Sequence, residues 1–374
     1  MDYLKKYGIP KFINAHDTIT LYGASRMSEE VYEAMSQISS CFTDMILLQR
    51  ILGERIARMT HNEGAYIANS AAGAIQLCCA AAMCGDDAFS YRCLPDTCRC
   101  RDEILVLHGQ YHCYVKAAES TGAKIKLAGD ADEVLLDDLE RMIGEKTAAV
   151  IYTTAQPFQA SSPSLKQVAE VAHRKQIPVI VDGAAQLPPV ENLWNFCEQG
   201  GDMVIFSGGK SIMGPQTSGL IVGKKEYIER CIQYGSPNHG ICRSSKASRE
   251  SMIGLCAALE SYVTRDHSQE REIWSGFVGR MIKELSGGIY KPFRVEQGSV
   301  GQSYPRMFLD LAEGVYAEAI QKKMYQKRIF VGCNQKTNQI YISPQNLTEQ
   351  ECGQVIRAFL EIEKELEIDG NNWK

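Results

Sequence analysis

One lysine and one aspartate stand where two buried strands are expected to end. Lys210 lies in the glycine-rich segment Ser207–Gly219, directly after the apolar run Met203–Phe206. Its small neighbours leave room for a planar group on the amine, and burial lowers the pKa of such an amine, which imine formation requires. Asp182 ends the apolar run Ile177–Asp182. An imine-forming lysine with a carboxylate that keeps a pyridine nitrogen protonated is typical of pyridoxal phosphate enzymes.

The tripeptide Gly209–Ser211 also resembles the end of a phosphate-binding P-loop. That motif requires a glycine five residues before its Gly-Lys-Ser, and the position holds Val204. Gly214 and Pro215 would stop the helix that has to follow a P-loop. The P-loop is therefore excluded, and a lysine in an ordinary surface turn is the remaining alternative.

A third segment is suited to the phosphate group of such a cofactor. The short buried strand predicted at Gly64–Asn69 continues into a helix opened by the small residues Ser70, Ala71, Ala72 and Gly73. Backbone N–H groups and the positive dipole end of a helix favour an anion at this point. An ordinary strand–helix turn is the alternative. No two glycines are separated by a single residue, so the dinucleotide fingerprint is absent and a nicotinamide cofactor is not expected.

Two histidines and one arginine are further candidates. His108 and His112 follow the strand predicted at Glu103–Leu107, where an imidazole could stack on the pyridine ring. A polar loop histidine is the alternative for both. Arg306 opens a later strand and could bind a substrate carboxylate through paired hydrogen bonds. A solvated arginine fits the same pattern.

The elements that must position these residues alternate along the chain. Such alternation is typical of an α/β fold with a mostly parallel sheet, which binds ligands at the carboxyl ends of its strands. Strands are predicted at 103–107, 124–127, 148–152, 178–182, 203–206 and 218–223, with helices at 113–121, 133–143 and 165–175.

Three regions are predicted. Residues 1–30 form an N-terminal arm, and residues 31–248 form the large cofactor-binding α/β domain. Residues 249–374 begin with a linking helix at 249–264 and form a smaller α+β domain. The elements predicted there are strands at 306–310 and 339–343 and helices at 315–323 and 347–366.

Composition restricts the partners and the compartment. The net charge of −5 argues against general attraction to nucleic acid or anionic membranes. No apolar run approaches the ~20 residues of a membrane helix, and the N-terminus lacks the apolar core of a signal peptide. A cytoplasmic enzyme is expected, and most of the fourteen cysteines are interpreted as reduced buried side chains. Cys93, Cys98 and Cys100 lack a fourth ligand at a standard offset, so exposed thiols are favoured over a metal site.

The ordered set of motifs resembles the selenocysteine synthase-like branch of fold-type I pyridoxal phosphate enzymes. Within that branch, the chain length and the Leu-Pro-Asp-Thr segment are most similar to ammonia-lyases that act on aminosugar acids. The resembling segments are Ile13–Ala15, Asn69–Ala72, Leu94–Thr97, Val181–Ala184, Phe206–Lys210 with Gly214–Gln216, and Arg243 with Lys246.

The resemblance implies a role for each site residue. Lys210 is the imine lysine, Asp182 the partner of the pyridine nitrogen, and Ser207 a phosphate contact. Gln186, Gln216 and Thr217 are expected beside the cofactor, and Arg243 and Lys246 are expected to bind an anion. It also implies a homodimer or higher homo-oligomer, in which Gln216, Thr217, Arg243 and Lys246 reach the neighbouring subunit.

The chain departs from the family pattern in three places. Relatives carry Asn-Ala-x-Gly where this chain has Asn14-Ala-His16-Asp17. Gln110 stands where an imidazole is expected, with His112 displaced by two positions. Cys242–Lys246 replaces a Gly-Arg-x-Met-Lys segment. These departures leave the expected cofactor residues in place. They bear on which substrate the enzyme accepts.

The resulting hypothesis is an ammonia-lyase that removes a β-hydroxyl and then ammonia from an amino acid or aminosugar acid, such as D-glucosaminate 6-phosphate. Selenium transfer on seryl-tRNA is an alternative, although those relatives carry an additional N-terminal domain and this chain begins close to Asn14. A different cysteine or serine lyase would use the same cofactor residues. A non-catalytic binding protein on the same fold is the alternative from another functional class.

Overall fold

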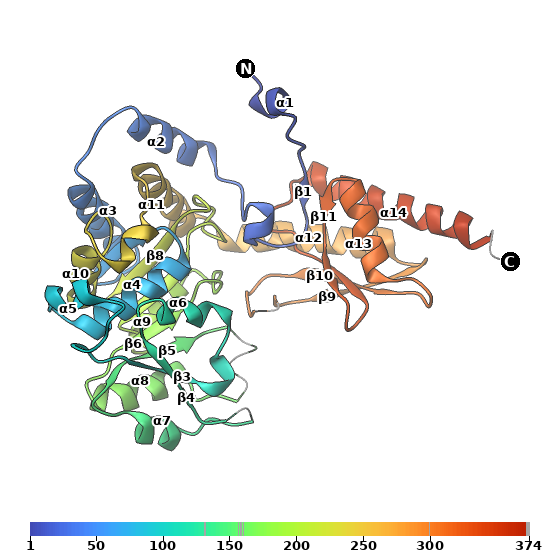
Figure 1. Cartoon of the computed structure of the whole chain (residues 1–374). Helices are drawn as coiled ribbons and strands as arrows, with labels where there is room; N and C mark the ends of the chain where they lie inside the picture. Colours follow the sequence, from blue (N-terminus) through green and yellow to red (C-terminus); the bar gives the residue numbers. More distant parts are fainter. Residues whose placement is uncertain (131, 156, 158, 160, 299, 372–374) are drawn as a thin grey trace. The chain divides into compact units, whose positions relative to one another are not determined.

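The computed structural model describes residues 1–371 except 131, 156, 158, 160 and 299 (Figure 1). The chain divides into two compact units. The larger unit runs from Ser25 to Arg265 and includes a short stretch that ends at Gln302. The smaller unit contains Met1–Ala24, Asp266–Gly298 and the chain from Ser303 onward.

This division differs from the predicted boundaries at 30/31 and 248/249. Helix α11 (Arg249–Thr264) packs against α2 (Glu29–Ser39) and α3 (Met45–Met59), so it belongs to the larger unit. In the smaller unit, β1 (Ile13–Asn14) pairs in parallel with β11 (Ile329–Phe330). Residues of the predicted arm are therefore part of the smaller fold.

A seven-stranded sheet forms the centre of the larger unit, in the order β2-β8-β7-β6-β5-β3-β4. Strand β8 is antiparallel to both of its neighbours, and the other pairs are parallel. The predicted mostly parallel sheet is therefore confirmed. The strands are β2 (Gly64–Ala68), β3 (Glu103–Leu107), β4 (Lys124–Ala128), β5 (Thr147–Thr153), β6 (Val179–Asp182), β7 (Met203–Ser207) and β8 (Gly219–Gly223).

Helices cover both faces of this sheet, which explains why its central strands are apolar along their whole length (Figure 1). On β5, Val150 and Tyr152 face one apolar core, and Ala149 and Ile151 face the other. The first core includes α3, α11, α8 (Leu165–Arg174) and α9 (Asn192–Glu198). The second includes α4 (Ala71–Cys84), α5 (Ala88–Cys93) and α10 (Lys225–Tyr234).

Two predicted helices are shorter than expected. The segment predicted at 113–121 is a 3-10 turn, Cys113–Val115, followed by the short helix α6 (Lys116–Glu119). The segment predicted at 133–143 forms α7 (Leu136–Met142). Asp130 accepts backbone hydrogen bonds from Asp132 and Glu133, which forms a turn in place of the first helical turn.

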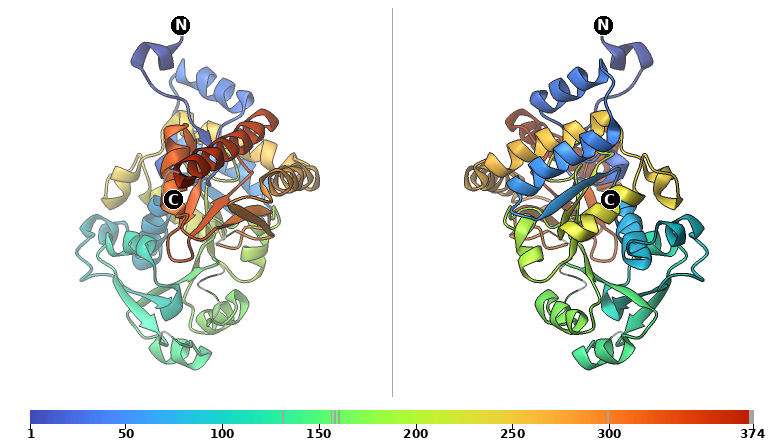
Figure 2. Two further views of the ribbon diagram at one scale, coloured as in Figure 1. Left: turned by 90° about the vertical axis from the view of Figure 1, so that its right-hand side faces the viewer. Right: turned by 90° about the vertical axis from the view of Figure 1, so that its left-hand side faces the viewer.

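The smaller unit is an antiparallel sheet with helices on one face (Figure 2). Its strand order is β12-β13-β10-β9, with β9 at Tyr290–Val295, β10 at Arg306–Leu311, β12 at Gly332–Asn334 and β13 at Gln339–Ile342. Met307 and Leu309 pack with α12 (His267–Leu285), α13 (Ala317–Gln326) and α14 (Glu349–Asn371). Phe308 alternates with these residues and stacks on Tyr341.

A buried carboxylate connects the helices and strands at the amino ends of β6 and β7. Asp202 is 1% exposed, and its Oδ2 accepts hydrogen bonds from the Val179 backbone at 2.7 Å and from His173 Nε2 at 2.8 Å. Its Oδ1 lies 2.6 Å from Lys224 Nζ. Because Asp202 directly precedes β7, these contacts connect β6, β7, α8 and the end of β8.

Replacing this carboxylate should destabilise the larger unit. We expect Asp202→Ala to lower the free energy of unfolding by roughly 3 kcal/mol, since it removes several charge-assisted hydrogen bonds from a buried position. His173→Ala and Lys224→Ala are matched controls and should each cost less than ~1 kcal/mol, because those side chains are 36% and 46% exposed. Urea denaturation of the three variants measures the difference. Equal losses in all three would contradict a central role for Asp202.

Candidate active site

The register of the sheet brings the predicted site segments to one edge. Gly219, the first residue of β8, pairs with Ala68 at the end of β2 and with Ser207 at the end of β7. Asp182 at the end of β6 pairs with Thr153 on β5 and with Ile205 on β7. The helix that follows Ala68, the loop that carries Lys210, and Asp182 therefore leave the sheet at the same edge.

The first turn of α4 has the geometry expected of a phosphate site. Ser70 caps the helix, and its Oγ accepts a hydrogen bond from Gly73 N at 3.0 Å. Residues 69–72 are partly exposed, although β2 before them is almost entirely buried. Any side chain at Gly219 would collide with the backbone of Ser70 and Ala71. The helix therefore begins close to β8, with the N–H groups of its first turn directed out of the sheet edge.

Asp182 is a buried carboxylate in contact with a histidine. It is 8% exposed, and its Oδ1 accepts a hydrogen bond from Ala184 N at 3.0 Å. Its Oδ2 lies 3.8 Å from His112 Nε2, which is also 3.1 Å from Thr153 Oγ1. Burial lowers the pKa of His112, with Asp182 opposing that effect, so the imidazole is neutral at neutral pH.

The structure explains the displaced histidine. Gln110 is fully buried, and its Oε1 accepts a hydrogen bond from Thr153 N at 2.8 Å. It connects the turn after β3 to β5, while His112 supplies the imidazole that reaches Asp182. Backbone hydrogen bonds, and to a smaller extent the charge of nearby His108, lower the pKa of Asp130. Of the two candidate histidines, His112 is the one seen in contact with Asp182, and this geometry favours it for the cofactor ring.

Backbone hydrogen bonds fix the conformation of the loop after β7. Gly208 N donates to Ser218 O at 3.0 Å, and Gly214 N donates to Gly208 O at 2.8 Å. Met213 N donates to the carbonyl of Lys210 at 2.9 Å. A side chain at Gly208 would collide with Ser218, so small residues are required for packing as well as for access. Lys210 is partly exposed, as a residue that must meet a ligand should be.

The remaining predicted residues differ in accessibility. Gln186 is buried and donates to Val300 O at 2.8 Å. Gln216 and Thr217 are exposed, although Thr217 Oγ1 lies 3.1 Å from Ser251 Oγ. Arg243 is partly exposed, and Lys246 is exposed. Their segment lies beside α4, because Ser245 Oγ donates to Gln76 Oε1 at 3.0 Å.

Arg306 belongs to the smaller unit, where it is 1% exposed and forms an ion pair with Asp17 at 2.9 Å. The alternative of a solvated arginine is therefore wrong. No role is predicted from the sequence for Thr153, which is 3% exposed and contacts His112. Its position as a polar residue directly after an apolar run was the available signal.

The cysteine segment is compatible with free thiols. Cys98 is exposed, Cys93 and Cys100 are partly exposed, and all three are unpaired with other cysteines. A hydrogen bond to Asp96 raises the pKa of Cys98, and burial raises that of Cys100. Within the described residues, no group of three or more His, Cys, Asp or Glu side chains is arranged to bind a metal.

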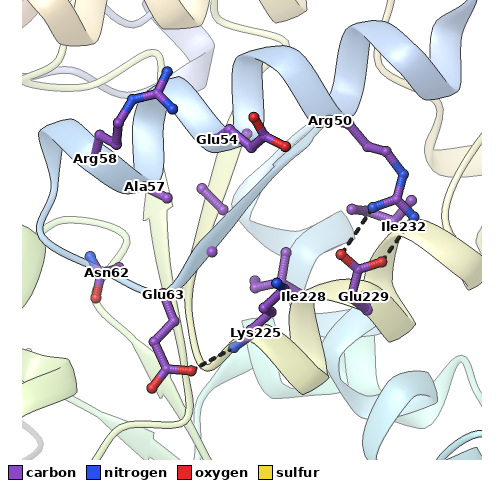
Figure 3. Close-up of a pocket in the computed structure, with 13 residues that line it drawn as sticks. Arg50, Glu54, Ala57, Arg58, Asn62, Glu63, Lys225, Ile228, Glu229 and Ile232 are labelled. Carbon is purple, nitrogen blue, oxygen red and sulfur yellow. Dashed lines mark hydrogen bonds and ion pairs between the residues drawn. The ribbon is translucent and has the colours of Figure 1, made fainter.

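A charged cavity of about 440 Å³ lies at the opposite end of β2 (Figure 3). It is lined by α3, by the start of β2 and by α10, and an Arg50–Glu229 ion pair of 2.9 Å closes one side. Gly64 pairs with Gly223 at this end of the sheet, whereas Ala68 pairs with Gly219 at the end where the site residues lie. The cavity is therefore separate from the candidate active site.

Comparisons with known proteins identify the family of this chain. The Aminotransferase class-V family model matches residues 88–251. D-glucosaminate-6-phosphate ammonia lyase of Salmonella typhimurium is 31% identical over 310 residues, which cover 81% of this chain and 80% of that enzyme. An L-seryl-tRNA(Sec) selenium transferase of Alkaliphilus metalliredigens is 25% identical over 273 residues, covering 66% of this chain and 54% of that enzyme.

A solved structure of D-glucosaminate-6-phosphate ammonia-lyase matches with a TM-score of 0.84 at 27% identity, covering 98% of this chain and 99% of the other. In the part of the chain that the structure describes, every helix is too short or too polar to cross a membrane. The predicted fold type I and the predicted pyridoxal phosphate cofactor are confirmed. The chain belongs to the D-glucosaminate-6-phosphate ammonia lyase family of pyridoxal phosphate-dependent enzymes.

Proposed function

We propose that this enzyme is an ammonia-lyase for an aminosugar acid with a second anionic group, such as D-glucosaminate 6-phosphate. The contact between Asp182 and the neutral His112, at the sheet edge where the Lys210 loop begins, carries the proposal. The family relationship supports the reaction type, since the relative covering 81% of this chain is named for that activity. The products are a 2-oxo acid and ammonia.

The residues at this edge fit the cofactor. The N–H groups at the start of α4 are suited to its phosphate, together with Ser207 at the end of β7. A neutral His112 is suited to stacking on the ring, because it adds no charge beside Asp182. Gln186, Gln216 and Thr217 are proposed as further contacts. Bound pyridoxal phosphate supplies an electron sink for the charge left when the α-proton is removed.

Two side chains of the protein have the remaining chemical roles. Asp182 holds a proton at the pyridine nitrogen through Oδ2, while its Oδ1 is occupied by Ala184 N. Lys210 would hold the cofactor through its amine, and the same amine would accept the α-proton as a general base. Loss of the β-hydroxyl and addition of water then release ammonia.

We propose that the positive side chains select the substrate. Arg306 binds its carboxylate, and Arg243 and Lys246 bind the second anion. Both residues of the second pair lie on the segment beside α4, and both are at least partly exposed. Three cations exceed what a simple amino acid with one carboxylate requires.

The quaternary proposal is a homodimer or a dimer of dimers. An apolar stripe on α3 supports it: Leu47 and Ile51 are 55% and 53% exposed and lie on the same helix face at a spacing of four residues. Exposed Gln216 and Thr217 are candidates to reach the partner's site.

We also propose a cytoplasmic location, since the fourteen cysteines are all free thiols.

The first experiment tests cofactor attachment. We expect the purified enzyme to show a visible absorbance band that Lys210→Ala abolishes, because the amine that binds the cofactor is lost. Lys225→Ala is the matched control: it removes a lysine at the opposite end of the sheet and should retain the band. Borohydride reduction followed by peptide mass spectrometry should place the cofactor on Lys210. Attachment to another lysine would refute the mechanism.

The second experiment tests the substrate class. Arg243→Ala should raise KM at least about tenfold for D-glucosaminate 6-phosphate, because a charge-assisted contact is lost, and should affect unphosphorylated D-glucosaminate little. Arg58→Ala, an arginine of the cavity in Figure 3, is the control and should leave both KM values unchanged. If serine is the better substrate and Arg243→Ala does not alter its kinetics, the phosphorylated substrate is wrong.

The third experiment tests self-association through α3. The double variant Leu47→Lys, Ile51→Lys should shift the sedimentation coefficient to that of a monomer and reduce kcat, because positive charges repel across a two-fold interface. Leu135→Lys is the control, since Leu135 is 52% exposed outside this helix. A wild-type enzyme that sediments as a fully active monomer would contradict the proposal.

A further inference from the structure

Asp182 and Thr153 are direct neighbours on one face of the large sheet. They pair across β6 and β5, and paired residues of adjacent strands lie about 5 Å apart. Alternation along the strands decides which face they occupy, because Ile151 and Ile180 belong to the apolar core that contains α4. Thr153 and Asp182 each stand two residues further along, so both side chains lie on the face that α4 covers.

His112 approaches both side chains with the same ring nitrogen. Its Nε2 lies 3.1 Å from Thr153 Oγ1, within the range of a hydrogen bond, and 3.8 Å from Asp182 Oδ2, which is beyond that range. Thr153 is 3% exposed, and its backbone N–H donates to Gln110 Oε1 at 2.8 Å. Of these two neighbours, the hydroxyl rather than the carboxylate is therefore hydrogen-bonded to the imidazole.

The other ring nitrogen of His112 shows where the imidazole proton lies. Nδ1 accepts a hydrogen bond from the backbone N–H of Tyr114 at 3.3 Å, at the start of the 3-10 turn Cys113–Val115. A backbone N–H can only donate, so Nδ1 carries a lone pair and the neutral imidazole carries its proton on Nε2. The Nε2–H group therefore donates to Thr153 Oγ1.

We propose that Thr153 is a positioning residue that holds the N–H of His112 away from the carboxylate of Asp182. This inference rests on the proposed pairing of Asp182 with the pyridine nitrogen of the cofactor. Oδ1 of Asp182 already accepts a hydrogen bond from Ala184 N, which leaves Oδ2 for the ring nitrogen. An imidazole N–H that turned to Oδ2 would compete with the ring nitrogen for that oxygen. Thr153 prevents the competition by accepting the imidazole hydrogen bond.

The first test measures cofactor affinity. Thr153→Val replaces the hydroxyl with a methyl group, so the buried N–H of His112 loses its acceptor and turns to Asp182 Oδ2, 3.8 Å away. We expect the apparent Kd of pyridoxal phosphate to rise about tenfold, because Asp182 then divides its charge between two donors. Thr153→Ser keeps the hydroxyl and should retain the wild-type Kd. Removal of the cofactor and titration with pyridoxal phosphate, followed by absorbance, measures each Kd without turnover.

Thr154 provides a matched control. It is 5% exposed, and its Oγ1 donates to the backbone carbonyl of Asp182 at 3.0 Å, so Thr154→Val also removes a buried hydroxyl beside Asp182. That bond does not involve the carboxylate. We expect Thr154→Val to lower the melting temperature and to leave the cofactor Kd unchanged. An equal rise in Kd for both valine variants would overturn the inference, because the loss of any buried hydroxyl here would then weaken the cofactor.

A second test locates the imidazole proton by NMR. The chain has seven histidines, so isotope-labelled histidine in the holoenzyme gives a small set of imidazole signals, and His112→Phe identifies the signal of His112. We expect the proton on Nε2 and a lone pair on Nδ1. A neutral imidazole with its proton on Nδ1 would overturn the inference, since Thr153 would then be the hydrogen-bond donor.

A double variant separates an effect through His112 from a direct contact with the cofactor. In a His112→Phe background, Thr153→Val should no longer change the cofactor Kd, because no imidazole N–H remains to be held. A tenfold rise that persists in this background would mean that Thr153 acts by another route, and the inference would be wrong. Thr153→Ala replaces Thr153→Val in all comparisons if the valine variant does not fold, as judged by its thermal melting curve.

The outcomes distinguish this inference from the proposed function. If Asp182→Asn leaves the cofactor Kd unchanged, the proposed pairing of Asp182 with the ring nitrogen is wrong. If Asp182→Asn weakens cofactor binding but Thr153→Val does not, that pairing stands and the inference about Thr153 is wrong.

Discussion

The pairing of Gly219 with Ala68 on one side and Ser207 on the other is the constraint on which the active site depends. It brings the start of α4 and the Lys210 loop to the same edge of the sheet. The pairing requires the backbone of Ser70 to pass so close to Gly219 that no side chain fits there. A glycine at this position is thus a geometric requirement of the site, even though Gly219 takes no part in the chemistry.

Electrostatic balance is the second feature of this edge. Asp182 is an anion in a mostly apolar region, and a carboxylate there is costly unless it is hydrogen-bonded or paired. The Ala184 backbone supplies a hydrogen bond, and the imidazole of His112 is close enough to respond to the charge. Because burial keeps His112 neutral, Asp182 remains available to a cationic ring nitrogen. This is the state that pyridoxal phosphate chemistry requires.

The smaller unit contains a buried positive charge that is neutralised by an ion pair. Its buried Arg306 is paired with Asp17, a residue 289 positions earlier in the chain. That pairing depends on β1, which joins the N-terminal segment to β11. A buried arginine without such a partner would be strongly unfavourable, so this contact contributes to the folding of the smaller unit.

The sequence by itself determined the α/β class, the position of Asp182 at a strand end and of Lys210 in the loop after the next strand, and the cofactor family. These follow from local patterns: apolar runs, small residues near a lysine, and a helix opened by small residues. The limits of α6 and α7 were less predictable, because Asp130 forms a local turn that competes with the first helical turn. Helices α10 and α12 were not predicted, although α10 carries apolar residues at helical spacing.

Only the tertiary structure decided which histidine meets Asp182 and what opposes Arg306. His108 and His112 follow the same strand, and their order along the chain does not show which one faces the carboxylate. That choice depends on the contacts of Gln110 and His112 with Thr153 across the sheet. Likewise, Asp17 and Arg306 are far apart in sequence. Their contact arises because β1 pairs with β11, which brings the N-terminal segment next to the C-terminal part of the chain. Long-range pairing of this kind leaves no local pattern from which it could be predicted.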